Sequence, residues 1–289
     1  MTRPKLRELF RLMRPTLAPT AAADVITAGV LAGAPLLPLT AAALGSTALY
    51  TAGMVQNDLF DRERDRRLFP DRPLVLDPGL VGVARLLCIA GFGLGLALCW
   101  FAGALWPALA VVVLASAYNG GVKRRFPWDT ITMGGARGFN LAIGLAVGGP
   151  ELAVDAPAYL AAYLLFIAGV TAASRAEDME PRETRRLALL LALLPQLLAL
   201  GAFASQAHQQ AALFLLPGVY LTLLYLRAFW MGSREGAIQY VLGALLGIYL
   251  IHSVTLWTTG KEFALVPILG CAALSFFLFG MARAARSED

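Results

Sequence analysis

Apolar residues in this chain are grouped in blocks of roughly twenty, and short charged stretches separate the blocks. About 20 apolar residues in a helix cross the hydrocarbon core of a bilayer. A helix also satisfies its own backbone hydrogen bonds in lipid. The pattern therefore predicts ten membrane helices, at residues 16–37, 39–57, 79–99, 101–118, 129–149, 156–174, 186–204, 210–230, 237–257 and 263–281.

The composition agrees with an all-α, polytopic membrane bundle. Hydrophobic residues make up 58% of the chain, the mean hydropathy is +0.66, and charged residues make up only 15%. A soluble domain usually carries about a quarter charged residues. Because the connections are short and no linker interrupts the blocks, we expect one domain over residues 1–289.

The positive charges predict the orientation of the bundle. With the N-terminus in the cytoplasm, both termini and the connections near 58–78, 119–128, 175–186 and 227–236 face inward. These stretches and the adjoining helix ends contain 23 of the 24 Lys and Arg residues, and only Lys261 faces outward. Such a bias is typical of the cytoplasmic side of a membrane protein. It explains the net charge of +5 without nucleic acid, and it predicts a bacterial-type cytoplasmic (inner) membrane protein.

The connections on the two sides also differ in length and chemistry. Outward connections are predicted to be tight, as at Leu37-Pro38 and Trp100-Phe101, whereas the inward ones are longer and carry nearly all the acidic residues. Any chemistry is therefore expected on the cytoplasmic side. The cysteines, Cys88, Cys99 and Cys271, lie inside apolar blocks without metal-binding spacing, so we expect them to be packing residues.

The first candidate site follows the second apolar block. If the helix continues, Asn57, Asp61 and Asp65 fall at i, i+4 and i+8 and project from one face. Such oxygen ligands suit Mg²⁺, which is commonly shared with substrate phosphates. Arginines on the flanks, Arg66 among them, could contact phosphate oxygens. A solvated charge run that only fixes topology is the alternative, but polar groups at the end of an apolar helix are costly and usually functional.

Three further groups lie on the same side of the membrane. Glu177 and Glu180, one helical turn apart after the sixth block, could hold a second Mg²⁺, with a solvated loop as the alternative. Lys123 and Arg124, after Tyr118, could clamp a diphosphate or serve only topology. Arg14 and Arg72 each precede a proline, and the extended geometry favoured there could aim them inward.

At these residues the chain resembles the UbiA superfamily of intramembrane prenyltransferases. Residues 57–65, Asn-Asp-Leu-Phe-Asp-Arg-Glu-Arg-Asp, match the NDxxDxxxD pattern at every defined position. Arg14-Pro15, Arg72-Pro73 and Tyr118 with Lys123-Arg124 are similar to further landmarks of the family. The resemblance implies a core of about nine helices around a cavity, to which a tenth, C-terminal helix is added. It also implies two Mg²⁺ ions that bind a prenyl diphosphate.

Carried over by residue, the resemblance assigns the first metal to Asn57, Asp61 and Asp65. It assigns the second metal to Glu177, Glu180 and Glu183, where the sequence departs from the family's DxxxD pattern because Thr184 stands at the last aspartate position. The resemblance also implies five catalytic residues: Asn57, Asp61, Asp65, Glu177 and Glu180. The string from Ser174 to Glu177 is similar to the EboC-like branch.

The resemblance implies Mg²⁺-dependent transfer of a prenyl group from a prenyl diphosphate to an aromatic or other lipophilic acceptor. Aromatic side chains could shield the allylic cation, with Tyr50, Tyr118, Phe139 and Phe166 as candidates. Two alternatives remain open. One is a terpene cyclase that uses no acceptor; the other is a lipid-binding or transport protein on the same scaffold, favoured by the irregular second motif.

Overall fold

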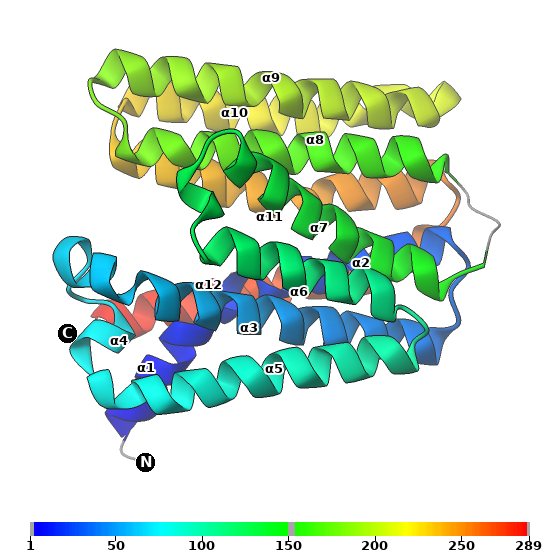
Figure 1. The fold of residues 1–289 in the computed structure, drawn as a ribbon. Coiled ribbons are helices and arrows are strands. Elements are labelled where there is room, and N and C mark those ends of the chain that lie inside the picture. The colour runs from blue at the N-terminus through cyan, green and yellow to red at the C-terminus, as the bar shows by residue number, and fades with distance from the viewer. Residues whose placement is uncertain (1–2, 150–153, 288–289) are drawn as a thin grey trace.

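The computed structural model describes residues 3–149 and 154–287, which form helices joined by short connections (Figure 1). Two short helices lie near the N-terminal third, α1 (Arg3–Met13) and α4 (Pro73–Leu76). The long helices are α2 (Ala18–Leu31), α3 (Leu36–Leu68), α5 (Val81–Phe101), α6 (Leu105–Asn119), α7 (Trp128–Val147), α8 (Ala156–Ser174), α9 (Arg182–Gln206), α10 (Leu215–Met231), α11 (Arg234–Thr258) and α12 (Leu265–Ser287). Each overlaps one of the ten predicted segments.

Six helical stretches within the described residues are long and apolar enough to cross a membrane, those containing α5, α8, α9, α10, α11 and α12. Helices α2 and α6, with 14 and 15 residues, are shorter than that criterion requires. Helices α2, α3 and α7 carry the buried polar residues Asp24, Asp61 and Arg137. Polar residues in a membrane bundle almost always face its interior. The three helices are therefore the ones that build the polar inside of the bundle.

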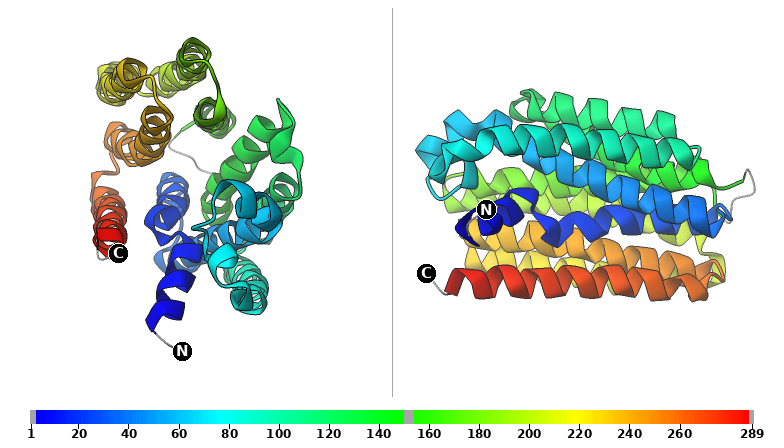
Figure 2. Two further views of the ribbon diagram at one scale, coloured as in Figure 1. Left: turned by 90° about the vertical axis from the view of Figure 1, so that its left-hand side faces the viewer. Right: turned by 90° about the horizontal axis from the view of Figure 1, so that it is seen from below.

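The long helices run side by side, and α2 occupies the middle of the arrangement (Figure 2). It contacts α3, α7, α11 and α12, so it touches both halves of the chain. The tenth predicted segment, α12, packs directly on α2 and α11. The backbones of α2 and α7 come very close at Gly144, where an added Cβ would lie 2.2 Å from the carbonyl oxygen of Val25. Small residues permit such close helix contacts in membranes.

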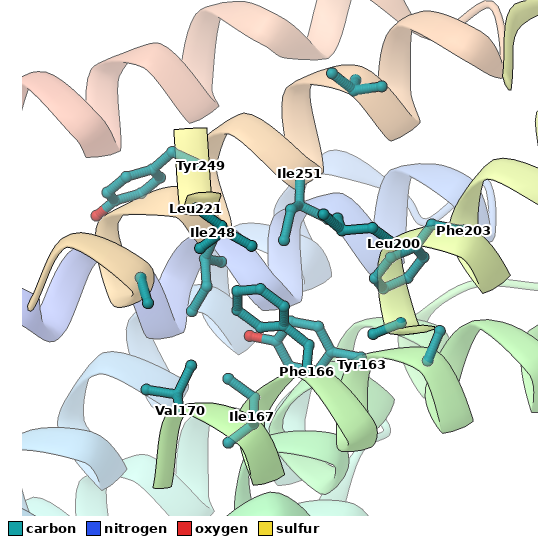
Figure 3. Close-up of a cluster of buried hydrophobic side chains, with 14 of the residues drawn as sticks. Tyr163, Phe166, Ile167, Val170, Leu200, Phe203, Leu221, Ile248, Tyr249 and Ile251 are labelled. Carbon is teal, nitrogen blue, oxygen red and sulfur yellow. The ribbon is translucent and has the colours of Figure 1, made fainter. Parts of the chain in front are cut away.

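The largest hydrophobic cluster joins α8, α9, α10 and α11 (Figure 3). Phe166 and Ile167 of α8 point toward Ile248 and Ile251 of α11 in this cluster, and Phe166 is completely buried. Of the four aromatic residues suggested for cation shielding, Phe166 is thus a core residue, whereas Phe139 is 44% exposed.

The tight outward turns differ from the predicted positions. The first lies at residues 32–35 rather than Leu37-Pro38, and the second at residues 102–104, after Trp100-Phe101. Gly33 and Gly103 adopt positive φ values of 66° and 81° in these turns. Glycine adopts that left-handed conformation without steric cost and commonly ends helices. The sequence signal was therefore the glycine and not the end of the apolar block.

Candidate active site

Helix α3 continues without a break through the acidic cluster to Leu68, as the sequence analysis requires. Its last three turns carry Asn57, Asp61 and Asp65 on one face, and both aspartates are buried. A carboxylate buried at the end of a membrane helix needs a cation or several donors to offset its desolvation. The buried carboxylates at this end of α3 therefore need a positive charge close by.

Lys123 supplies a positive charge there, from the short helix Val122–Arg124 that follows α6. Its Nζ donates to Oδ1 of Asn57 at 2.8 Å and to Oδ2 of Asp61 at 2.5 Å. The other carboxylate oxygen of Asp61 is buried and has no hydrogen-bond partner among the described residues, although Nη2 of Arg124 lies 3.9 Å away. Two oxygens that converge on a cation beside a third, unpaired oxygen form a donor set that fits Mg²⁺.

Within residues 3–149 and 154–287, no three His, Cys, Asp or Glu side chains are grouped as a closed metal site. A Mg²⁺ ion usually takes one or two protein carboxylates and completes its octahedron with water and substrate phosphates. The amide oxygen of Asn57 would supply a further protein ligand.

Asp58 is set apart from the neighbouring carboxylates by two arginines. Nη2 of Arg14 donates to Oδ1 of Asp58, and Nη1 of Arg72 lies 3.5 Å from the same oxygen. Arg72 has the extended backbone predicted before Pro73, but Arg14 has a positive φ of 44°. The prediction of an extended Arg14 is thus wrong, because the chain turns sharply there between α1 and α2. Both guanidiniums nevertheless reach the cluster.

The electrostatics of the cluster shift two pKa values. Burial raises the pKa of Asp65; Arg72 opposes this shift, and the nearby carboxylate of Asp61 adds to it. Burial lowers the pKa of the Lys123 ammonium, although its contact with Asp61 acts in the opposite direction. Burial is the largest cause of both shifts, so the site is only partly hydrated.

The other predicted diphosphate ligands divide into two groups. Arg124 lies beside Asp61, and the hydroxyl of Tyr118 experiences the charges of Asp129, Asp61 and Glu177, so both belong to the same end of the bundle. Arg66 instead pairs with Glu63 at 3.1 Å, and both side chains are largely exposed. The structure does not bring Arg66 together with Lys123 and Asp61.

The second acidic motif is divided in the same way. Glu177 lies in the short helix Arg175–Asp178 and acts electrostatically on Tyr118, next to the first cluster. Glu180 is 80% exposed and accepts a hydrogen bond from Arg185 at 2.7 Å. Glu183 is exposed in the first turn of α9. Only Glu177 of the three is placed beside the cluster on α3.

This division gives a prediction for the second motif. Glu177→Gln is expected to slow release of diphosphate from a prenyl diphosphate by about 10²-fold, the scale for one preorganised electrostatic group. Glu183→Gln, a matched loss of one charge nearby, is expected to change it less than about twofold, since exposed substitutions have small effects. Diphosphate release by the purified variants measures both, and equal effects would contradict the placement of Glu177.

Sequence reasoning missed the polar residues inside the bundle. Arg137, counted above with the inward-facing charges, is buried in the middle of α7, where it pairs with Asp24 of α2 at 2.8 Å. Asp129 is also buried and pairs with Arg175 at 3.2 Å. The signal was available, because a lone aspartate and a lone arginine within apolar blocks are expensive and usually functional.

The model of the UbiA prenyltransferase family matches residues 16–183, which include residues 57–65, Lys123 and residues 177–183. The chain belongs to the UbiA prenyltransferase family. A curated relative, protoheme IX farnesyltransferase 2 of Natronomonas pharaonis, is 32% identical over 178 residues. The match covers 57% of this chain and 38% of that relative.

Solved structures of UbiA homologues share the fold. A homologue from Aeropyrum pernix K1, solved in its apo form, superimposes with a TM-score of 0.66 at 19% identity over 82% of this chain and 96% of that one. A homologue from Archaeoglobus fulgidus, bound to GPP and Mg²⁺, gives 0.64 at 18% identity over 86% and 99%. The protein is thus an all-helical integral membrane protein with the UbiA fold.

Proposed function

We propose that this protein is a Mg²⁺-dependent prenyltransferase that transfers a prenyl group from a prenyl diphosphate to a lipophilic acceptor. The observation that carries the proposal is the Lys123 ammonium between the oxygens of Asn57 and Asp61. It shows that these two side chains already converge on a cation. The Archaeoglobus fulgidus homologue with GPP and Mg²⁺ supports the same ligand class for the fold.

In this proposal each part of the cluster has a separate role. Asn57, Asp61 and Asp65 would hold Mg²⁺ on the α3 face, and Glu177, which acts electrostatically on Tyr118, would contribute a further carboxylate. When bound, Mg²⁺ supplies Lewis-acid stabilisation of the charge on the leaving diphosphate. Lys123 and Arg124 would bind diphosphate oxygens, and Arg14 and Arg72, fixed by Asp58, would complete the positive wall.

Cleavage of the allylic C–O bond leaves both electrons on the diphosphate and a cation on the prenyl group. The fixed positive groups stabilise the leaving diphosphate without reorganisation, which is the main source of electrostatic catalysis. Tyr118, whose hydroxyl experiences the charge of Asp61, and Tyr50, seven residues before Asn57 on α3, would stabilise the cation through their rings. The acceptor then supplies the electron pair that forms the new bond and loses a proton.

The proposal also covers location and partners. The distribution of Lys and Arg supports a cytoplasmic position for the N-terminus and the cluster, in a bacterial-type inner membrane. The curated relative's name gives protohaem as the acceptor in that protein. For this chain we propose only a lipophilic acceptor, with no nucleic acid among its partners.

A non-catalytic lipid-binding protein is the second candidate, and one observation favours it. Two of the three acidic residues expected at the second metal, Glu180 and Glu183, are exposed. A protein with one functional metal position could bind a prenyl diphosphate without cleaving it.

The test is incubation of the purified, reconstituted protein with labelled prenyl diphosphates of several lengths, with and without Mg²⁺. We expect Mg²⁺-dependent release of diphosphate and a labelled lipid product when membrane extract supplies the acceptor. A hydrocarbon product from the prenyl diphosphate alone would instead indicate a cyclase. Tight Mg²⁺-dependent binding without any diphosphate release would indicate the lipid-binding alternative.

A further inference from the structure

A groove of about 410 Å³ lies on the surface of the bundle, where α10, α11 and α12 follow one another along one side (Figure 2). It is at the same end of the bundle as the acidic cluster. The guanidinium of Arg234, at the start of α11, lies 5.3 Å from the centre of the Phe69 ring, directly after α3. The walls of the groove are mostly apolar, and the residues that line it include Leu224, Leu246, Phe276, Phe279, Arg227 and Gln239.

The two polar residues of the groove lie within one helical turn of the same level. Helices α10 and α11 run in opposite directions, joined by a short connection. They meet at Ala228, whose carbonyl oxygen would lie 3.2 Å from a Cβ added to Gly236. Arg227 directly precedes Ala228, and Gln239 follows Gly236 by one turn. The groove therefore has its charged and amide groups together, near the ends of the helices.

The apolar part of the groove lies farther along the helices. The hydroxyls of Tyr249 on α11 and Ser275 on α12 are 2.7 Å apart, which fixes the level of these two helices. Leu246, one turn before Tyr249, and Phe276, next to Ser275, are thus close to one level, and Phe276 is 61% exposed. Leu246 follows Gln239 by seven residues, about 10 Å along the helix axis. The groove therefore changes from polar to apolar in the direction in which a lipid does.

The polar groups of the groove are not satisfied by the protein. Arg227 is exposed and forms no hydrogen bond or ion pair among the residues that the structure describes. Nε2 of Gln239 donates to Oε1 of Glu235 at 2.9 Å. Because a carboxylate only accepts, the amide nitrogen must face Glu235 and the amide oxygen points away from it. That oxygen is buried and has no donor in the described part of the chain, so it calls for an external one.

We propose that this groove is a binding site for a phospholipid whose headgroup is an ammonium with at least one N–H, as in phosphatidylethanolamine. The phosphodiester would pair with the guanidinium of Arg227, a charge-assisted contact. The ammonium would donate to the amide oxygen of Gln239, beside the carboxylate of Glu235. One acyl chain would lie against Leu246 and Phe276. Basic pockets between membrane helices bind lipid headgroups in this way. The inference does not depend on the proposed function.

The charges of the groove select this headgroup over the other common ones. A positive Arg227 and a negative Glu235 complement a zwitterion with a phosphate and an ammonium. Phosphatidylglycerol has the phosphate but no positive charge for Glu235. Phosphatidylcholine has both charges, but its nitrogen carries three methyl groups and cannot donate to Gln239. The amide oxygen of Gln239 is therefore the group that distinguishes the two zwitterionic lipids.

The test is native mass spectrometry of the full-length protein in detergent micelles, titrated with phospholipids that all carry two oleoyl chains. The series is phosphatidylethanolamine, its N-methyl and N,N-dimethyl forms, phosphatidylcholine and phosphatidylglycerol. We expect the first three to bind with Kd values within about threefold of one another. Phosphatidylcholine should bind about tenfold more weakly, because the third methyl group removes the last N–H and with it one charge-assisted hydrogen bond. Phosphatidylglycerol should also bind about tenfold more weakly than phosphatidylethanolamine.

Variants separate the three parts of the site. Gln239→Leu should bind phosphatidylethanolamine as weakly as phosphatidylcholine, Arg227→Gln should weaken both lipids about tenfold, and Leu246→Trp, which fills the groove, should weaken both at least as much. Arg85→Gln is the matched control, because it removes an exposed arginine near the start of α5, outside the groove, and should change neither Kd beyond about twofold.

The wild-type series alone can overturn the inference, so it does not depend on the folding of any variant. Equal Kd values for phosphatidylethanolamine and phosphatidylcholine would do so, as would tighter binding of phosphatidylglycerol than of phosphatidylethanolamine. A wild-type dimer that binds none of these lipids and that Leu246→Trp dissociates would assign the groove to a second copy of the chain instead.

Discussion

Asp61→Ala is expected to reduce diphosphate release from a prenyl diphosphate by about 10²–10³-fold or more. The substitution removes a carboxylate that would hold the Mg²⁺ ion bound to the leaving diphosphate. Asp61 is the residue on which Lys123 and Arg124 converge, and it carries the buried oxygen without a hydrogen bond. Its loss would therefore remove both the proposed metal ligand and the anchor of two basic groups. Release of labelled diphosphate by protein in nanodiscs measures the effect.

Asp61→Asn separates metal binding from folding, since the amide can still accept the hydrogen bond from Lys123. It is expected to lose nearly as much activity as Asp61→Ala while it melts close to the wild-type temperature. Glu63→Gln, an exposed carboxylate two residues along the same helix, is the control and should change turnover less than about twofold. Full turnover in a folded Asp61→Asn protein would contradict the metal assignment.

Lys123→Met is expected to have two opposite effects. In the absence of prenyl diphosphate, it should tighten binding of Mn²⁺, a paramagnetic substitute for Mg²⁺, by about tenfold or more. The Lys123 ammonium contacts both Asn57 and Asp61, where the metal would bind. Two like unit charges about 4 Å apart near a protein surface repel by about 4 kcal/mol. The flexible lysine can move away, which relieves a large part of this repulsion. Electron paramagnetic resonance of free Mn²⁺ gives the Kd.

The same variant is expected to release diphosphate about 10²-fold more slowly. It lacks the ammonium group that would contact the diphosphate once the metal has displaced it from Asn57 and Asp61. Arg125→Met is the matched control: it removes one positive charge from the same connection, but Arg125 is exposed. It should alter neither the Mn²⁺ affinity nor turnover beyond about twofold. If Lys123→Met and Arg125→Met bind Mn²⁺ equally, Lys123 does not share the metal position.

A large part of the candidate site was predictable from local sequence alone. The spacing of Asn57, Asp61 and Asp65 places them on one helix face, provided that the helix continues, and α3 does continue to Leu68. The same spacing leaves Asp58 on a different face, where the structure pairs it with Arg14 and Arg72. A helical repeat needs no tertiary information, so this part of the site follows from the chain itself.

Other parts depended on which segments pack together. Glu177, Glu180 and Glu183 are equivalent as acidic residues. Only Glu177, in the short helix between α8 and α9, acts electrostatically on Tyr118, whereas the other two are exposed. Arg66 and Lys123 were equally good phosphate ligands by type. The structure pairs Arg66 with Glu63 on an exposed surface and brings Lys123 into the cluster from another helix end.

The sequence by itself determined the class of fold, the ten helical segments and the face of α3 that carries Asn57, Asp61 and Asp65, because hydrophobic length and helical periodicity are local properties. Only the tertiary structure decided which polar residues meet. Asp24, Arg137 and His252 are separated by more than a hundred residues at each step, so no local repeat links them. Their contact exists because α2 lies at the centre of the bundle, between α7 and α11, where a charge must find its partner inside the protein.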